Sequence, residues 1–203
     1  MKLKNAIVSS AALLAVSFPS FLLGAEPSKR ALEIIESRCM LCHGPEGERG
    51  SATYPRLAAQ NAAYLEKQLR DFREGRRSSE AMTGLTRDLS DRDITELAEY
   101  FSKSPAQSRP ARNAAEAELG KKLYFEGLPA AGVTACAACH GNDAHGTAEL
   151  PRLAGQLPSY VEAQLMKFAT RERTNDASLM NLIAAGLNDS QRRALAVYLS
   201  SQH

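Results

Sequence analysis

The sequence predicts an all-α protein in which two similar domains follow one another along 203 residues. A five-residue pattern, Cys-x-x-Cys-His, occurs twice, at 39–43 and at 136–140, and uses all four cysteines of the chain. The residues after each copy recur at closely similar intervals, which indicates an internal repeat. Abundant Ala, Leu, Glu, Lys and Arg favour helices, and no alternating apolar pattern of useful length indicates a strand.

An export signal is predicted at residues 1–25. Two lysines supply a positive start, an apolar run extends over 6–23, and Gly24 and Ala25 are small residues suited to cleavage. The alternative is an uncleaved membrane anchor, since the run approaches the length that spans a bilayer. Pro19 and several serines interrupt the run, so cleavage is the preferred interpretation.

The remaining chain divides at a segment rich in proline, small and charged residues. We expect an N-terminal domain at 26–103, a linker at 104–112 and a C-terminal domain at 113–203. The interval from the repeated proline to the repeated phenylalanine is the same in both domains, and so is that from methionine to leucine. The repeated residues are Pro55, Tyr64, Phe72, Met82 and Leu89, then Pro151, Tyr160, Phe168, Met180 and Leu187.

Each domain is expected to contain three helices in the same order. The first leads toward the cysteine motif, at 28–38 and at 113–125. The second follows a Pro-Arg-Leu-Ala segment and carries the repeated tyrosine and phenylalanine at helical spacing. The third begins after Ser90, an N-cap residue with an acidic side chain three positions on, and its counterpart begins at Asn188 or Asp189.

Cys-x-x-Cys-His is the attachment signature of c-type haem. Its two thiols can bond the two vinyl groups of one porphyrin, and the adjacent histidine then lies under the iron as an axial ligand. We therefore predict two covalently bound haem c groups per chain. The predicted residues are Cys39 and Cys42 with His43, and Cys136 and Cys139 with His140.

Other uses of these cysteines explain the pattern less well. A disulfide framework gives no reason for a histidine after each pair. A zinc site formed by Cys136, Cys139, His140 and His145 is the stronger alternative. Structural zinc sites usually separate the cysteine pair from the histidine pair by a dozen or so residues, and the first motif has no second histidine nearby.

The second axial ligand decides what kind of haem protein this is. A methionine thioether suits electron transfer. Met82 and Met180 occupy equivalent positions in the two repeats and are predicted as axial ligands, the alternative being flexible core fillers. Met40 lies within the motif, Met166 lies mid-helix without a counterpart, and two sites of paired histidines would require both remaining histidines. Six-coordinate iron offers no open site, so we expect an electron carrier and not an enzyme.

Other repeated residues allow two interpretations each. The carbonyls of Pro55 and Pro151 could accept a hydrogen bond from the adjacent haem-ligating imidazole, or the prolines could mark simple turns. Arg56 and Arg152 could bind haem propionates or remain solvated. The repeated tyrosines are expected mainly to pack in the core.

With these motifs in place, the chain resembles the cytochrome c4 family. The resemblance rests on both Cys-x-x-Cys-His units, on the Pro-Arg-Leu-Ala-(Ala/Gly)-Gln segments and on the segments around Met82 and Met180, and it covers nearly all of the chain past the signal. It implies two class I cytochrome c folds in a pseudo-twofold relation, facing each other through their haems. It also implies a periplasmic carrier, soluble or loosely membrane-associated, that passes electrons toward terminal oxidases. Its donor would be a membrane cytochrome complex or a dehydrogenase.

Charge narrows the possible partners, and two rival functions stay open. The net charge is +2, and acidic and basic side chains are nearly balanced in each half, so no nucleic-acid partner is expected. One rival is the dihaem cytochrome subunit of a periplasmic dehydrogenase, such as a sulfide-oxidising flavocytochrome. The other is a haem enzyme or gas sensor in which one methionine is labile.

Overall fold

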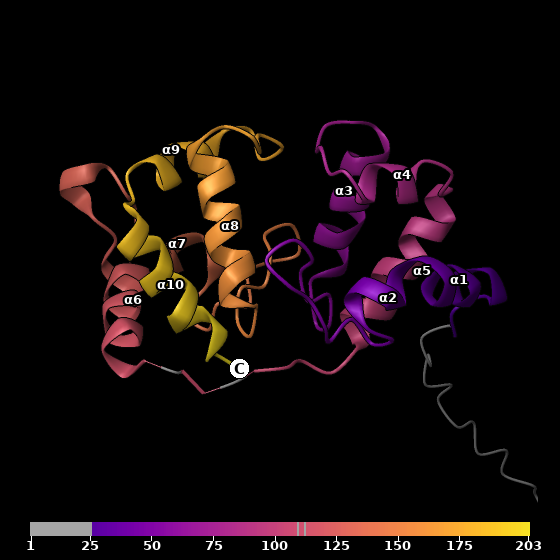
Figure 1. The fold of residues 1–203 in the computed structure, drawn as a ribbon, viewed down its shortest axis with the longest axis horizontal. Helices are drawn as coiled ribbons and strands as arrows, with labels where there is room; N and C mark the ends of the chain where they lie inside the picture. Colours follow the sequence, from indigo (N-terminus) through magenta and orange to yellow (C-terminus); the bar gives the residue numbers. More distant parts are fainter. Residues whose placement is uncertain (1–25, 109, 112) are drawn as a thin grey trace, which may run out of the picture.

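The computed structural model describes residues 26–108, 110–111 and 113–203, and these residues form two helical bodies joined by one connecting segment (Figure 1). Within them, β-structure is limited to a single bridge between Leu128 and Val133, which confirms the predicted all-α class. None of the described helices combines the length and the apolar character needed to span a bilayer. The predicted export signal lies outside the described residues.

The N-terminal body begins with a continuous helical run that ends at the first motif. Its elements are α1 (Lys29–Ile34), the π-helical turn η1 (Ile35–Cys39), α2 (Met40–His43), α3 (Ala62–Arg73), α4 (Met82–Thr86) and α5 (Asp91–Lys103). The helix predicted at 28–38 therefore continues to His43. The π turn accommodates one extra residue within the run, a feature that helices often show at functional sites.

The C-terminal body repeats this order with one interruption. Its elements are α6 (Ala114–Glu126), the 3-10 turn η2 (Pro129–Ala131), α7 (Ala137–His140), α8 (Pro158–Ala169), α9 (Leu179–Ala185) and α10 (Asp189–Ser200). Here the entry helix stops at Gly127, whose φ is 67°. A Cβ at this position would overlap the Val133 carbonyl oxygen, so the chain can turn back here only with glycine.

Capping residues determine where α5 and α10 begin, the last helix of each body, as predicted. Ser90 caps α5 and forms a capping box with Asp93. Asn188 caps α10 and forms a capping box with Gln191. Of the two starting points considered for the last helix, Asn188 is therefore the cap and Asp189 the first helical residue.

Each body has its own apolar cluster. In the N-terminal body, α1, α3 and α5 contribute buried residues that include Ile34, Leu65 and Leu97. In the C-terminal body, the cluster is built mainly from α6, α8 and α10. The last helix of the N-terminal body, α5, ends at Lys103, and the first helix of the C-terminal body, α6, begins at Ala114. The bounds given to the two domains and the linker remain a prediction.

The close approach of α6 and α10 generates a stability prediction. A Cβ at Gly120 would overlap the carbonyl of Ala194 on α10, so Gly120→Ala should push the helices apart. Overpacking of this kind costs about 1–3 kcal/mol. We expect a loss of that size in the free energy of unfolding, measured by urea titration. The exposed Glu118→Ala on the same helix should change it by less than about 0.5 kcal/mol.

A second stability prediction concerns Asp93, which links α5 to α1. Its carboxylate accepts hydrogen bonds from Arg30 Nε at 2.7 Å and Arg30 Nη2 at 3.1 Å and also bonds to Ser90, so its pKa falls from 3.8 to about 2. A lowered pKa means that the ionised carboxylate stabilises the fold above pH 3.8, and that this contribution disappears as pH falls toward 2. Asp93→Asn should therefore cost about 1–2 kcal/mol at pH 6.

The pH dependence of the unfolding free energy shows whether the ionised carboxylate of Asp93 causes the loss. The difference in unfolding free energy between wild type and Asp93→Asn should narrow between pH 4 and pH 2. Asp88→Asn removes an exposed ion pair with Arg38 and should have little effect. A deficit for Asp93→Asn that is independent of pH would contradict the assignment.

Candidate haem sites

Helical turns bring the thiols of each motif together. Cys39 ends η1 and Cys42 lies in α2, while Cys136 precedes α7 and Cys139 lies within it. Residues three apart share a helix face. All four thiols are free. Burial raises the pKa of Cys39 and of Cys136 to about 11, as expected of thiols against apolar surroundings.

A single cavity of about 1020 Å³ extends from one motif to the other across the boundary between the bodies. Pockets for one small molecule measure roughly 300–1,000 Å³, so this volume is large even for that class. Apolar side chains of α3, α5 and α8 form much of its wall. The lining includes Cys39, His43 and Met82 from the N-terminal body, and Cys136, Cys139, His140 and Met180 from the C-terminal body.

Both motif histidines are buried, and a hydrogen bond at Nδ1 fixes the orientation of each ring. His43 Nδ1 lies 2.8 Å from the Pro55 carbonyl oxygen, and His140 Nδ1 lies 3.2 Å from that of Pro151. A carbonyl can only accept, so Nδ1 carries the proton and Nε2 keeps its lone pair for a metal. Burial lowers the pKa of both imidazoles, with the proline carbonyls opposing it. The predicted acceptor role of Pro55 and Pro151 is confirmed.

Two of the methionines past the signal segment reach the cavity. Met82 begins α4 and Met180 is the second residue of α9, and both are partly buried in the cavity wall. Met40 and Met166 are exposed and take no part in the lining. Sequence periodicity missed α4 and α9 because each is too short to show a helical repeat.

The structure does not assemble the alternative zinc site. His145 Nε2 donates to the His203 carbonyl at 2.6 Å, and its Nδ1 faces Asp143. Among the residues described, no three side chains of His, Cys, Asp or Glu lie close enough to hold a metal ion. Neither His145 nor His203 lines the cavity, so neither is placed to ligate a haem iron there.

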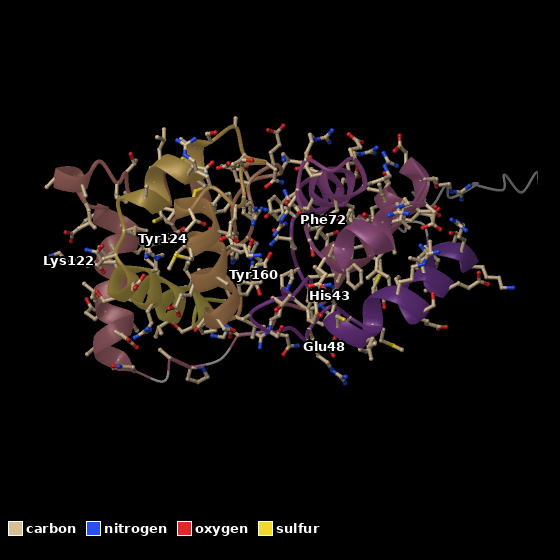
Figure 2. All side chains as sticks on the ribbon, turned by 45° about the horizontal axis from the view of Figure 1, so that its top comes forward. His43, Glu48, Phe72, Lys122, Tyr124 and Tyr160 are labelled. Atoms are coloured by element: carbon tan, nitrogen blue, oxygen red, sulfur yellow. The ribbon has the colours of Figure 1, made fainter. Side chains whose placement is uncertain are left out.

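Two arginines that sequence reasoning passed over lie between the bodies. Arg77 Nη1 donates to Gln68 Oε1 at 2.7 Å, and Arg77 Nη2 donates to Tyr160 Oη at 3.0 Å and Gln164 Oε1 at 2.9 Å. Figure 2 shows Tyr160 near the boundary, on the body opposite His43. These bonds hold α8 of one body against the segment after α3 of the other.

Arg173 repeats the pattern in the opposite direction. Its Nη1 donates to Gln164 at 2.9 Å, and its Nη2 donates to Tyr64 Oη at 2.9 Å and Gln68 Oε1 at 3.1 Å. Tyr64 is predicted mainly to pack in the core. In the structure its hydroxyl also joins the two bodies, because it accepts the hydrogen bond from Arg173. The signal that could have found the arginines is their place in the repeat, since each follows the repeated phenylalanine at the same interval.

This cluster supplies positive charge to the cavity wall. Arg77 stacks 4.7 Å over the Phe72 ring, and Arg173 stacks 4.5 Å over the Phe168 ring. The hydrogen-bond acceptors of both guanidiniums within the described residues are neutral. Arg173 is buried and Arg77 is half-buried, and the carboxylate that acts on Arg173 is Asp176, which also lines the cavity. A second guanidinium beside the first leaves room for a further anionic partner. The anionic propionates of haem fit such a wall, just as the free thiols, the imidazole Nε2 atoms and the apolar lining fit its porphyrin and iron.

Arg56 and Arg152, the arginines of the repeated Pro-Arg-Leu-Ala segments, are expected from the sequence either to bind haem propionates or to be solvated. Arg56 is buried and donates to the Gly155 carbonyl at 2.6 Å and the Glu48 carbonyl at 3.1 Å. The solvated interpretation is therefore wrong for Arg56. Arg152 is half-buried and lines the cavity.

Two family models match the chain, one to each body. The model described as cytochrome C oxidase, cbb3-type, subunit III matches residues 27–101, and the model described as cytochrome c matches residues 117–203. The matched ranges contain one motif each. Each body therefore corresponds to a cytochrome c domain with its own covalently bound haem c.

Relatives match this chain along both of its domains. A thiosulfate dehydrogenase electron acceptor from Thiomonas intermedia is 38% identical over 197 residues, which cover 94% of this chain and 90% of the relative. Cytochrome c4 from Pseudomonas aeruginosa is 37% identical over 169 residues, which cover 81% of this chain and 84% of the relative.

Solved structures show the same fold. Reduced recombinant cytochrome c4 from Pseudomonas stutzeri superposes with a TM-score of 0.81 and 33% identity, covering 88% of this chain and all of that one. The thiosulfate dehydrogenase TsdBA from Marichromatium purpuratum gives a TM-score of 0.74 and 31% identity. That match covers 86% of this chain and 40% of the larger protein.

Proposed function

The chain belongs to the cytochrome c4 family of dihaem electron carriers, and on this premise we propose that it moves single electrons between periplasmic redox proteins through two haems, each ligated by one histidine and one methionine. One observation carries the ligation proposal. From each repeat, one buried histidine and one partly buried methionine line the same cavity, and the chain's other two histidines and two exposed methionines do not. The assigned pairs are His43 with Met82 and His140 with Met180.

The side chains of the cavity have separate tasks in this proposal. Haem bound here supplies a centre that gains and loses one electron. The four motif thiols, of which Cys42 lies outside the cavity lining, would hold it covalently, and the proline carbonyls orient the imidazoles. Arg77 and Arg173 would hold propionates, and the apolar wall excludes water. With one histidine and one methionine assigned to each iron, no coordination site would be left for a substrate, which supports a carrier and not an enzyme.

The proposed setting is the periplasm, reached through the signal at residues 1–25. We propose a membrane cytochrome complex or a dehydrogenase as electron donor and a terminal oxidase as acceptor, with at most loose association with the membrane. The family membership supports these partners, because an electron carrier needs one redox protein that reduces it and another that oxidises it.

A second candidate is the electron acceptor or cytochrome subunit of a sulfur-compound dehydrogenase. It is favoured by the similarity to a relative named thiosulfate dehydrogenase electron acceptor and to the structure of thiosulfate dehydrogenase TsdBA. A sulfide-oxidising flavocytochrome would be another dehydrogenase of this kind. The two candidates differ in the donor, not in the chemistry of the haem sites.

The ligation proposal is tested by the far-red absorption band that a methionine–iron bond gives in ferric haem. Met82→Ala and Met180→Ala should each remove about half of the band, and the double variant should remove all of it, because each thioether serves one iron. The matched control is Met166→Ala, an exposed methionine outside the cavity, which should keep the full band. A full band in Met82→Ala would contradict the assignment of that residue.

Reduction kinetics distinguish the two candidate functions. Oxidised protein is mixed with thiosulfate and a catalytic amount of a thiosulfate dehydrogenase, and in parallel the reduced protein is mixed with membranes containing a terminal oxidase. A general carrier should be oxidised by the membranes in the absence of any dehydrogenase. Fast reduction by the thiosulfate system without oxidation by the membranes would favour the dehydrogenase partner instead.

A further inference from the structure

One peptide group links the first histidine to the opposite body. The carbonyl of the Pro55–Arg56 amide accepts from His43 Nδ1 at 2.8 Å, and the N–H of the same amide donates to Gln156 Oε1 at 2.9 Å. A hydrogen bond at one end of an amide polarises it and strengthens the bond at the other end. A continuous chain of bonds therefore runs from His43 across the boundary to Gln156.

The second histidine has the mirror-image arrangement. His140 Nδ1 lies 3.2 Å from the carbonyl of the Pro151–Arg152 amide, whose N–H donates to Gln60 Oε1 at 2.7 Å. Gln60 and Gln156 close equivalent segments of the two repeats. Each body thus provides the glutamine that bonds to the amide behind the other body's imidazole.

Both glutamines are held in one orientation. Gln156 Nε2 donates to the Arg56 carbonyl at 2.9 Å, and Gln60 Nε2 donates to the Arg152 carbonyl at 2.9 Å. Each side chain is only 7% exposed. A primary amide has both an acceptor oxygen and a donor NH2 group, so it can accept from the backbone N–H and donate to the backbone carbonyl of the same residue.

We propose that Gln60 and Gln156 are positioning residues that couple the two haem sites, each setting the electron donation of the histidine in the other domain. The proposal rests on the axial roles given above to His43 and His140. A stronger acceptor at Nδ1–H makes an imidazole a more basic ligand, and a more basic ligand favours the oxidised iron. Losing Gln156 should therefore favour reduction at the His43 site, and losing Gln60 should favour reduction at the His140 site.

The experiment uses the holoprotein with 15N-labelled histidine. NMR spectra follow the hyperfine-shifted Nδ1–H signals of His43 and His140 during a redox titration, so that each site reports its own state. At the potential that half-reduces the His43 site of the wild type, Gln156→Leu should raise the ratio of reduced to oxidised iron at this site roughly 1.5- to 3-fold. This corresponds to an upward shift of its midpoint potential by about 10–30 mV, at 59 mV per tenfold change in the ratio. The ratio at the His140 site should change less, and the Nδ1–H signal of His43 should move.

Two further variants test the proposal, one at the other site and one with the opposite expected effect. Gln60→Leu should act mainly on His140. Gln156→Glu loses the donor to the Arg56 carbonyl but keeps an acceptor oxygen for the Arg56 N–H and adds negative charge, so it should lower the reduced fraction at the His43 site. Gln60→Leu, at the opposite site, keeps the proposal testable if Gln156→Leu fails to fold.

Asn61→Ala is the matched control for a loosened interface. Asn61 Nδ2 crosses the boundary to the carbonyls of His145, Thr147 and Leu150. The contact of Asn61 with Gln60 Oε1 is made by its backbone N–H at 2.9 Å, which alanine keeps, so both ratios should stay at wild-type values. Equal shifts at both sites in Gln156→Leu, or a shift only at His140, would overturn the coupling and leave the proposed function intact. If wild-type His43 and His140 gave no hyperfine-shifted signals, the axial assignment, and with it the proposed function, would fail.

Discussion

Each motif histidine has its Nδ1 atom held by a proline carbonyl, and this hydrogen bond constrains the chain on both sides of it. The helix carrying the histidine has to end at once, so that the chain can return beneath the ring. Gly44 and Gly141 end these helices with φ of 82° and 80°, a conformation in which other residues are strained. The Arg49 N–H then donates to the His43 carbonyl, which fixes the loop that leads to Pro55.

The boundary between the bodies is polar, although it adjoins an apolar cavity. Arg173 buries its charge there, and Arg77 and the tyrosine and glutamine partners bury hydrogen-bonding groups, which is unfavourable unless the groups are paired. Paired, such networks are directional and define one arrangement where apolar contacts would allow several. The two bodies are small, and small domains bury a limited fraction of their surface alone. The shared cavity and its polar border therefore make one unit of two domains.

Much of this architecture could be predicted from the sequence, because its signals are local. Caps such as Ser90 and Asn188 and the two cysteine motifs depend on residues a few positions apart. The helices α4 and α9 could not be predicted, since each presents too few turns for a periodic pattern. The roles of Gln60 and Gln156 were equally hidden, because their partners lie about a hundred residues away along the chain.

The pairing of Gln60 and Gln156 with main-chain atoms has an evolutionary consequence. A tandem repeat of this kind is the expected product of gene duplication, after which the halves accumulate different substitutions. The hydrogen bonds of each glutamine side chain go to main-chain atoms, namely the N–H and carbonyl of residue 56 or 152 and the N–H of the residue that follows the glutamine, so side chains around it can change without spoiling the match. The neighbouring positions already differ, with Ala59 in one half and Gly155 in the other. The two halves can therefore diverge toward different partners while their mutual orientation is inherited unchanged.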